Sequence, residues 1–205
     1  MNWETLLCLG DSITFGARSY LGYPEICGSI LEKQLEKKWN VINHATHGFT
    51  TIDLVRSLNS ELISYKQIFP SLISIMIGTN DIKNKTAISD FEIAFRQLLV
   101  KATLFSVNNN IVCLKIPRFT NKVFYPYHYD MNAKVKEFNL LIEKLATEHG
   151  CRYLELNLSD DDFYDGVHFS SKGSTTAGNQ LASYILKDKG FENFTDLSEI
   201  ALSAD

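Results

Sequence analysis

The chain has 205 residues, of which 45% are hydrophobic, and a formal net charge of −4 with basic and acidic residues interspersed. This length and composition fit one globular domain, residues 1–205, with a substantial core. The scattered charges form no basic patch, so we expect neither nucleic acid nor an anionic membrane surface as a partner. No stretch approaches the roughly 20 apolar residues that a membrane-spanning helix needs.

The amino terminus lacks the basic segment and the long apolar stretch of a secretory signal. We therefore expect a cytoplasmic protein, unless the sequence is a mature form whose signal has been removed. The four cysteines, at positions 8, 27, 113 and 151, lie singly in apolar segments and show no CxxC spacing. They are expected to be reduced and buried, and no metal site is indicated.

Apolar runs and helical periodicity alternate along most of the chain. The first apolar run stops at Gly10-Asp11-Ser12, which predicts a buried strand that ends in a loop. In chain order, the predicted elements are strand 6–9, helix 26–38, strand 41–42, helix 52–62, strand 72–77, helix 91–102, strand 111–117, helix 135–145, strand 153–156 and helix 171–186. This alternation predicts an α/β protein, a three-layer α/β/α sandwich with a five-stranded, mostly parallel sheet. Residues 190–205 are interpreted as an appended C-terminal helix.

Two segments have features without an assigned role. The loop at 118–132 is rich in aromatic residues, which either line a substrate pocket or pack the loop onto the body of the protein. Three consecutive aspartates, residues 160–162, are expected to form a solvated turn rather than a metal site.

Chemically suggestive residues follow the predicted strands. Ser12 follows the first strand, Gly48 the second, Asn80 the third, and Asp165 and His168 the fifth. Because ligands bind beyond the carboxyl ends of parallel strands, these residues are expected to converge at one edge of the sheet. A serine nucleophile needs a base, a carboxylate that orients the base, and donors for the developing oxyanion. His168 can be the base and Asp165 its partner, with donors at the Ser12 and Gly48 N–H groups and the Asn80 side-chain amide.

Each of these residues also has a purely structural interpretation. Asp11 or Ser12 can cap a following helix, and Gly48 and Asn80 are typical of turns. His168 can be a surface or capping residue. The functional interpretation is favoured because all of these positions fall at the same predicted edge of the sheet.

Four blocks resemble those of the SGNH hydrolases, also called GDSL-type esterases and lipases. They are Gly10-Asp11-Ser12-Ile13, Asn43 through Gly48, Gly78-Thr79-Asn80-Asp81 and Asp165-Gly166-Val167-His168. The resemblance implies a flavodoxin-like sheet with no cofactor. It also implies catalytic roles for Ser12, Asp165 and His168, and an oxyanion hole formed by Ser12, Gly48 and Asn80. Two positions depart from the family pattern: Ile13 replaces the leucine of the family's name, and Ala45 stands where many members carry glycine.

The expected function is that of a serine ester hydrolase that forms an acyl-enzyme on Ser12 with a small-molecule ester. Short acyl esters, or O-acetylated small molecules or sugars, are the expected substrates because no extended apolar lid is apparent. One alternative is an acyltransferase that uses the same residues, and another is a binding module that has lost catalysis. The acyl and alcohol groups and the oligomeric state remain open at this stage.

Overall fold

The computed structural model describes residues 3–106 and 109–187. The helix predicted over residues 190–205 lies outside these described residues. Within them, no helix is long and apolar enough to cross a membrane.

The centre of the protein is a sheet of five parallel strands in the order β2-β1-β3-β4-β5. The strands are β1 (Glu4–Gly10), β2 (Trp39–Ala45), β3 (Leu72–Met76), β4 (Ile111–Leu114) and β5 (Arg152–Leu154). This is the strand order of the flavodoxin-like fold. The predicted α/β architecture is therefore confirmed, with every strand of the sheet parallel.

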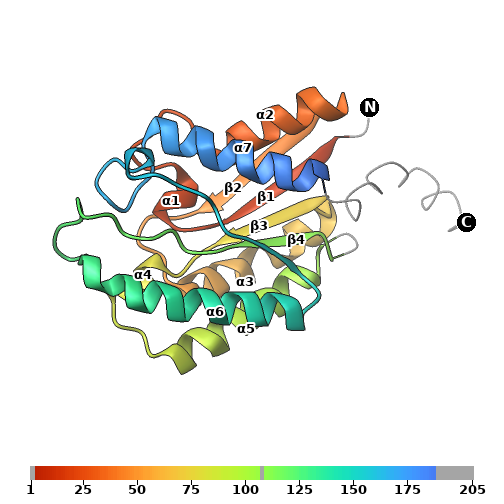
Figure 1. The fold of residues 1–205 in the computed structure, drawn as a ribbon. Helices are drawn as coiled ribbons and strands as arrows, with labels where there is room; N and C mark the ends of the chain where they lie inside the picture. Colours follow the sequence, from red (N-terminus) through yellow and green to blue (C-terminus); the bar gives the residue numbers. More distant parts are fainter. Residues whose placement is uncertain (1–2, 107–108, 188–205) are drawn as a thin grey trace, which may run out of the picture.

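Helices cover both faces of this sheet. Figure 1 shows α2 (Tyr23–Leu35) and α7 (Ser171–Lys187) on one face, and α3 (Thr51–Ile68), α5 (Ile88–Thr103) and α6 (Asn132–Glu148) on the other. The chain runs from β1 outward to β2 and then crosses back past β1 to β3. Right-handed crossovers in these two directions place the helices on opposite faces.

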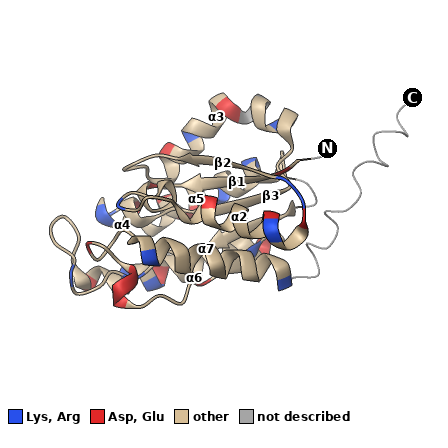
Figure 2. Cartoon of the chain, turned by 90° about the horizontal axis from the view of Figure 1, so that it is seen from above, with Lys and Arg blue, Asp and Glu red and all other residues tan. Residues whose placement is uncertain are grey.

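Most of the strands could be found from their composition because they are buried in the core of the protein. All five residues of β3 are buried, as expected for a parallel strand covered on both faces. On α5, the buried residues recur at the predicted helical spacing, from Phe91 to Ala102. The four cysteines are free and buried, as predicted. Figure 2 shows that Lys, Arg, Asp and Glu lie mainly on the helices and loops around the sheet.

Several short elements differ from the prediction. Two brief helices, α1 (Ser12–Phe15) and α4 (Thr79–Lys83), follow β1 and β3 directly, where only loops or caps were expected. The aspartates at 160–162 form a 3-10 turn, η3 (Asp160–Asp162), and the prediction that they are solvated is wrong for Asp162. Its carboxylate lies away from solvent, where it accepts hydrogen bonds from Ser159 and from Thr176 of α7. These bonds replace the water that the buried carboxylate has lost.

Candidate active site

Three neighbouring strands end side by side and define the edge at which the site lies. In the sheet register, Gly10 at the end of β1 pairs with Ala45 of β2 and with Met76 of β3. Ser12 and Asn80 follow two of these strand ends within four residues. Gly48 follows the third by three residues. The common edge predicted from the sequence therefore exists.

Ser12 is the first residue of α1, and Asp11 is the N-cap of that helix. The Asp11 Oδ1 atom accepts a hydrogen bond of 3.0 Å from the backbone N–H of Ile13. This is the capping geometry that the structural interpretation predicted. The cap also fixes the turn from which the Ser12 side chain projects, so capping and a chemical role are compatible.

The Ser12 hydroxyl is the first member of a hydrogen-bonded chain of three side chains. Its Oγ lies 2.9 Å from His168 Nε2, across 156 positions of sequence. On the other side of the imidazole ring, His168 Nδ1 lies 2.8 Å from Asp165 Oδ2. An ionised carboxylate only accepts hydrogen bonds, so Nδ1 carries a proton; in the neutral imidazole, Nε2 then presents a lone pair to the Ser12 hydroxyl.

The ionisation of Asp165 follows from its hydrogen bonds. Burial alone would raise the pKa of this carboxyl, but it is opposed by hydrogen bonds from the side chain and backbone of His168, and from the N–H of Val167. The net effect lowers the pKa of Asp165 to about 2. The carboxylate is therefore ionised at neutral pH and holds the imidazole in one orientation.

A short hairpin presents Asp165 and His168. Phe163 and Phe169 form an antiparallel bridge at its base, and the Tyr164 N–H donates to the His168 carbonyl at 2.8 Å. The hairpin is also tied to the aromatic loop, because the Thr120 N–H donates to the Gly166 carbonyl at 3.0 Å. Asp165 and His168 are thus held by a hydrogen-bonded turn that lies outside the sheet.

The segment after β2 is held by two neighbouring side chains of α4. Asn80 Nδ2 donates to the Phe49 carbonyl at 3.0 Å, and Asp81 Oδ2 accepts from the backbone N–H of Thr51 at 2.9 Å. Between these anchors and the strand lies Gly48, whose φ of +79° is a conformation that favours glycine. Within the described part of the chain, the Gly48 N–H donates to no other residue.

Comparison with known proteins bears on these observations. The GDSL-like lipase/acylhydrolase family model matches residues 8–175, a stretch that contains the whole hydrogen-bonded chain. The chain belongs to this family. It is accordingly a carboxylic ester hydrolase, and the resemblance seen in the four sequence blocks is confirmed.

Solved structures agree with this GDSL-like fold. Two variants of Axe2, an acetylxylan esterase from Geobacillus stearothermophilus, each superpose with a TM-score of 0.71 at 20% identity, covering 88% of this chain and 93% of theirs. LAE5, an α/β hydrolase from the metagenome of Lake Arreo in Spain, superposes with a TM-score of 0.70 at 19% identity, covering 88% and 94%. A comparison with curated proteins found no match.

The structure adds side chains to the site of this GDSL-like hydrolase that sequence reasoning missed. Lys83 Nζ lies 2.8 Å from Asn80 Oδ1, and the Tyr127 hydroxyl lies 3.2 Å from the same oxygen. Asp81, which anchors the segment after β2, was predicted only as part of a sequence block. Lys83 follows Asn80 by three residues, a spacing that brings side chains together on a helix, but α4 is too short to show periodicity.

Asp11, the N-cap of the helix that carries Ser12, is almost fully buried, with 1% of its surface exposed. Burial raises the pKa of this carboxyl to about 6, although the Ile13 N–H and the nearby His168 act in the opposite direction. Its Oδ2 atom has no hydrogen-bond partner among the described residues.

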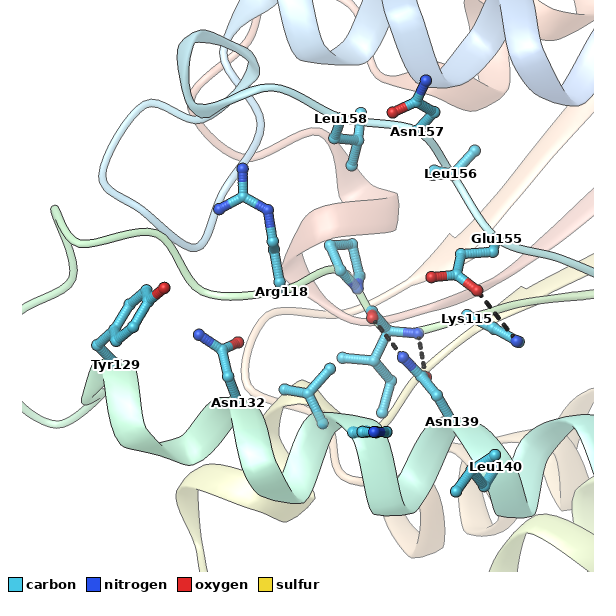
Figure 3. A pocket seen from close by; sticks show the side chains of 14 residues that line it. Lys115, Arg118, Tyr129, Asn132, Asn139, Leu140, Glu155, Leu156, Asn157 and Leu158 are labelled. Carbon is cyan, nitrogen blue, oxygen red and sulfur yellow. Dashed lines mark hydrogen bonds and ion pairs between the residues drawn. The ribbon is translucent and has the colours of Figure 1, made fainter.

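A separate cavity of about 620 Å³ lies between α6 and the segments that follow β4 and β5 (Figure 3). Arg118 and Tyr129 stand at one end in this view, and Lys115 and Glu155 at the other. In the part of the chain that the structure describes, its lining includes none of the five candidate residues. The same described part contains no cluster of three or more His, Cys, Asp or Glu side chains that could hold a metal.

Proposed function

We propose that this hydrolase cleaves esters through an acyl-enzyme on Ser12, with His168 as general base and general acid and Asp165 as its orienting partner. The hydrogen-bonded chain from Ser12 through His168 to Asp165, with links of 2.9 and 2.8 Å, is the observation that carries the proposal. It supplies the nucleophile, the base and the orienting carboxylate in the order that the chemistry requires.

In the first half of the reaction, Ser12 Oγ attacks the ester carbonyl carbon and passes its proton to His168 Nε2. The carbonyl oxygen becomes an oxyanion, and the tetrahedral intermediate then collapses. The bond to the leaving alcohol breaks as His168 returns the proton to that alcohol's oxygen, which leaves the acyl group on Ser12. In the second half, water repeats the sequence, releases the acid and restores the Ser12 hydroxyl.

We assign the oxyanion hole to the backbone N–H groups of Ser12 and Gly48 and to the side-chain amide of Asn80. The supporting observations are the common strand edge, the Gly48 N–H that has no partner among described residues, and the link from Asn80 to the Phe49 carbonyl. Donors fixed in advance need no reorganisation when the negative charge develops, which is why such groups contribute strongly to rate.

We propose short acyl esters, in particular O-acetylated small molecules or sugars, as substrates. Two exposed aromatic rings lie next to the candidate residues in sequence: Phe15, three residues after Ser12, and Tyr164, directly before Asp165. Phe15 also packs against the His47 ring, with centroids 4.4 Å apart. Exposed ring faces of this kind can stack on a sugar or an aryl group. Axe2, which shares the fold, is described as an acetylxylan esterase.

The test measures hydrolysis of p-nitrophenyl esters of increasing acyl length, with acetylated xylo-oligosaccharides alongside. Ser12→Ala should reduce kcat by at least about a thousandfold, whereas Ser60→Ala, which removes an exposed hydroxyl on α3, should leave it unchanged. A fluorophosphonate should label the wild-type protein stoichiometrically and should not label Ser12→Ala.

Three results would count against the proposal. A Ser12→Ala protein that keeps more than a few per cent of activity would exclude Ser12 as nucleophile. A wild-type protein that is neither labelled nor active would support a binding module. Acyl transfer to added alcohol that exceeds hydrolysis would show an acyltransferase instead.

A further inference from the structure

The Asn80 carboxamide has more hydrogen-bond partners than its proposed role requires. Its oxygen accepts from the Lys83 ammonium at 2.8 Å and from the Tyr127 hydroxyl at 3.2 Å, and its Nδ2 donates one hydrogen to the Phe49 carbonyl at 3.0 Å. An ammonium can only donate and a carbonyl can only accept, so these partners fix which end of the amide is nitrogen. One N–H of Asn80 remains for a ligand.

Lys83 brings a positive charge to this amide. Its side chain is half-buried, and no carboxylate of the described residues lies within ion-pairing distance of its ammonium group. A cation on the oxygen of an amide draws electron density away from the nitrogen, which makes the opposite N–H a stronger donor. If the remaining Asn80 N–H donates to an oxyanion, the Lys83 charge stands at the opposite end of the same carboxamide, where surrounding protein screens it less than water does.

Tyr127 is held in place as the second donor. Burial, together with the nearby Asp11 and Asp165 carboxylates, raises the pKa of its hydroxyl to about 12, so the group keeps its proton. Its ring packs on Phe119, with centroids 5.4 Å apart. The Asn132 side chain of α6 in turn bonds both backbone groups of Phe119.

The start of the aromatic loop is fixed in a similar way. Asn139 bonds the N–H and the carbonyl of Ile116 at 2.7 and 2.9 Å, and Figure 3 shows these two bonds between α6 and the segment after β4. The loop that carries Tyr127 is therefore attached to α6 at two points seven residues apart along that helix. The Tyr127 hydroxyl is positioned by this framework before any ligand is present.

We propose that Lys83 and Tyr127 are positioning residues that lock the Asn80 carboxamide and strengthen its remaining N–H as an oxyanion donor. This inference rests on the proposed function, since it requires that Asn80 faces the reacting carbonyl. Because the oxyanion exists only in the transition state and the tetrahedral intermediates, the two residues act on kcat and have little effect on KM.

The experiment compares Lys83→Met and Tyr127→Phe with Lys85→Met, using p-nitrophenyl acetate. Lys85→Met removes the same charge from an exposed lysine two residues away. Direct loss of an oxyanion donor costs about 10²–10³ in kcat, so weakening one should cost less. We expect kcat to fall about tenfold in Lys83→Met and about threefold in Tyr127→Phe, with KM changed less than twofold. Lys83→Arg, which keeps the cation, should lose less activity than Lys83→Met.

Two further measurements separate this role from a general structural one. An alkyl boronic acid, which forms a tetrahedral adduct on a serine nucleophile, should bind more weakly by the same factor by which kcat falls. In an Asn80→Ala background, Lys83→Met should have no further effect, because its influence passes through the Asn80 amide.

The outcomes also distinguish this inference from the proposed function. If wild type is active and Ser12→Ala is not, but Lys83→Met behaves like Lys85→Met, the proposed function stands and the role of Lys83 is refuted. A Lys83→Met effect that persists in full without Asn80 refutes it as well. If the wild-type protein is neither active nor labelled, both fail together.

Discussion

Replacing Asp165 with asparagine tests whether this carboxylate works by fixing the proton of His168. Asp165 Oδ1 accepts the backbone N–H groups of Val167 and His168, at 3.1 and 2.8 Å, while Oδ2 faces His168 Nδ1 at 2.8 Å. Asparagine has nearly the same shape, and its oxygen can keep both backbone hydrogen bonds. Its NH₂ group would then donate to Nδ1, which drives the ring proton to Nε2, the atom that we propose accepts the Ser12 proton.

The expected loss follows from the tautomer, because the same exchange in Ser-His-Asp proteases lowers kcat about 10⁴-fold while the geometry is kept. The shift of the Asp165 pKa from 3.8 to about 2 corresponds to about 2 kcal/mol of preference for the ionised form in the folded protein, and this bears on the stability of the variant rather than on kcat. We therefore expect kcat to fall by about three to four orders of magnitude, with KM nearly unchanged.

The assay is hydrolysis of p-nitrophenyl acetate, with the rate of fluorophosphonate labelling as a second measure of Ser12 reactivity. Asp161→Asn makes the same exchange at an exposed aspartate on the same loop and should stay within twofold of wild type. Circular dichroism and thermal melting should show that both variants are folded. If Asp165→Asn keeps more than about a tenth of the wild-type kcat, control of the His168 tautomer is not what Asp165 contributes.

Two further predictions concern stability. Because burial raises the pKa of Asp11 from 3.8 to about 6, its stabilising effect is complete below pH 3.8 and is lost as the pH rises through 6. Between pH 4 and pH 8, the free energy of unfolding of wild type should therefore fall by about 2 kcal/mol relative to Asp11→Asn, measured by urea denaturation; a constant difference would contradict this. A Cβ at Gly173 would clash with the Asp162 carbonyl oxygen. Gly173→Ala should thus lower the free energy of unfolding by about 1–3 kcal/mol. A loss no larger than that caused by Thr175→Ala, at an exposed position, would show that α7 shifts to accommodate the methyl group without strain.

Most of the fold could be predicted because the buried strands and the long helices produce apolar patterns that extend over many consecutive residues. A strand buried on both faces, such as β3, is a continuous apolar run, and α5 repeats its buried residues at helical spacing. The short elements could not be found in this way. Four or five residues, as in α1 and α4, make about one turn, so no periodicity develops. β5 is a short edge strand with partly exposed residues, and its predicted end was two residues too late.

The candidate site likewise has a part that the sequence could predict and a part that it could not. Residues that follow strand ends could be predicted, because strand order and direction determine where those ends lie. The aromatic loop could not be interpreted, since its path depends on contacts with α6. In the structure, Phe119 and Tyr127 pack inward, as the packing interpretation predicts, while Phe124, Tyr125 and Tyr129 are exposed. The burial of Asp162 likewise depends on Thr176, a partner from α7 that no local pattern indicates.

The aromatic loop connects two parts of the site that the sheet does not join. The sheet carries Ser12 and the segments of Gly48 and Asn80, whereas the hairpin after β5 carries His168 and Asp165. Thr120 bonds to Gly166 in that hairpin, and Tyr127, seven residues later, bonds to Asn80. A displacement of this loop would thus disturb both Asn80 and His168. In the proposed mechanism these two residues act at the same carbonyl group, so fixing the loop to α6 would preserve their relative geometry, which neither the sheet nor the hairpin can do alone.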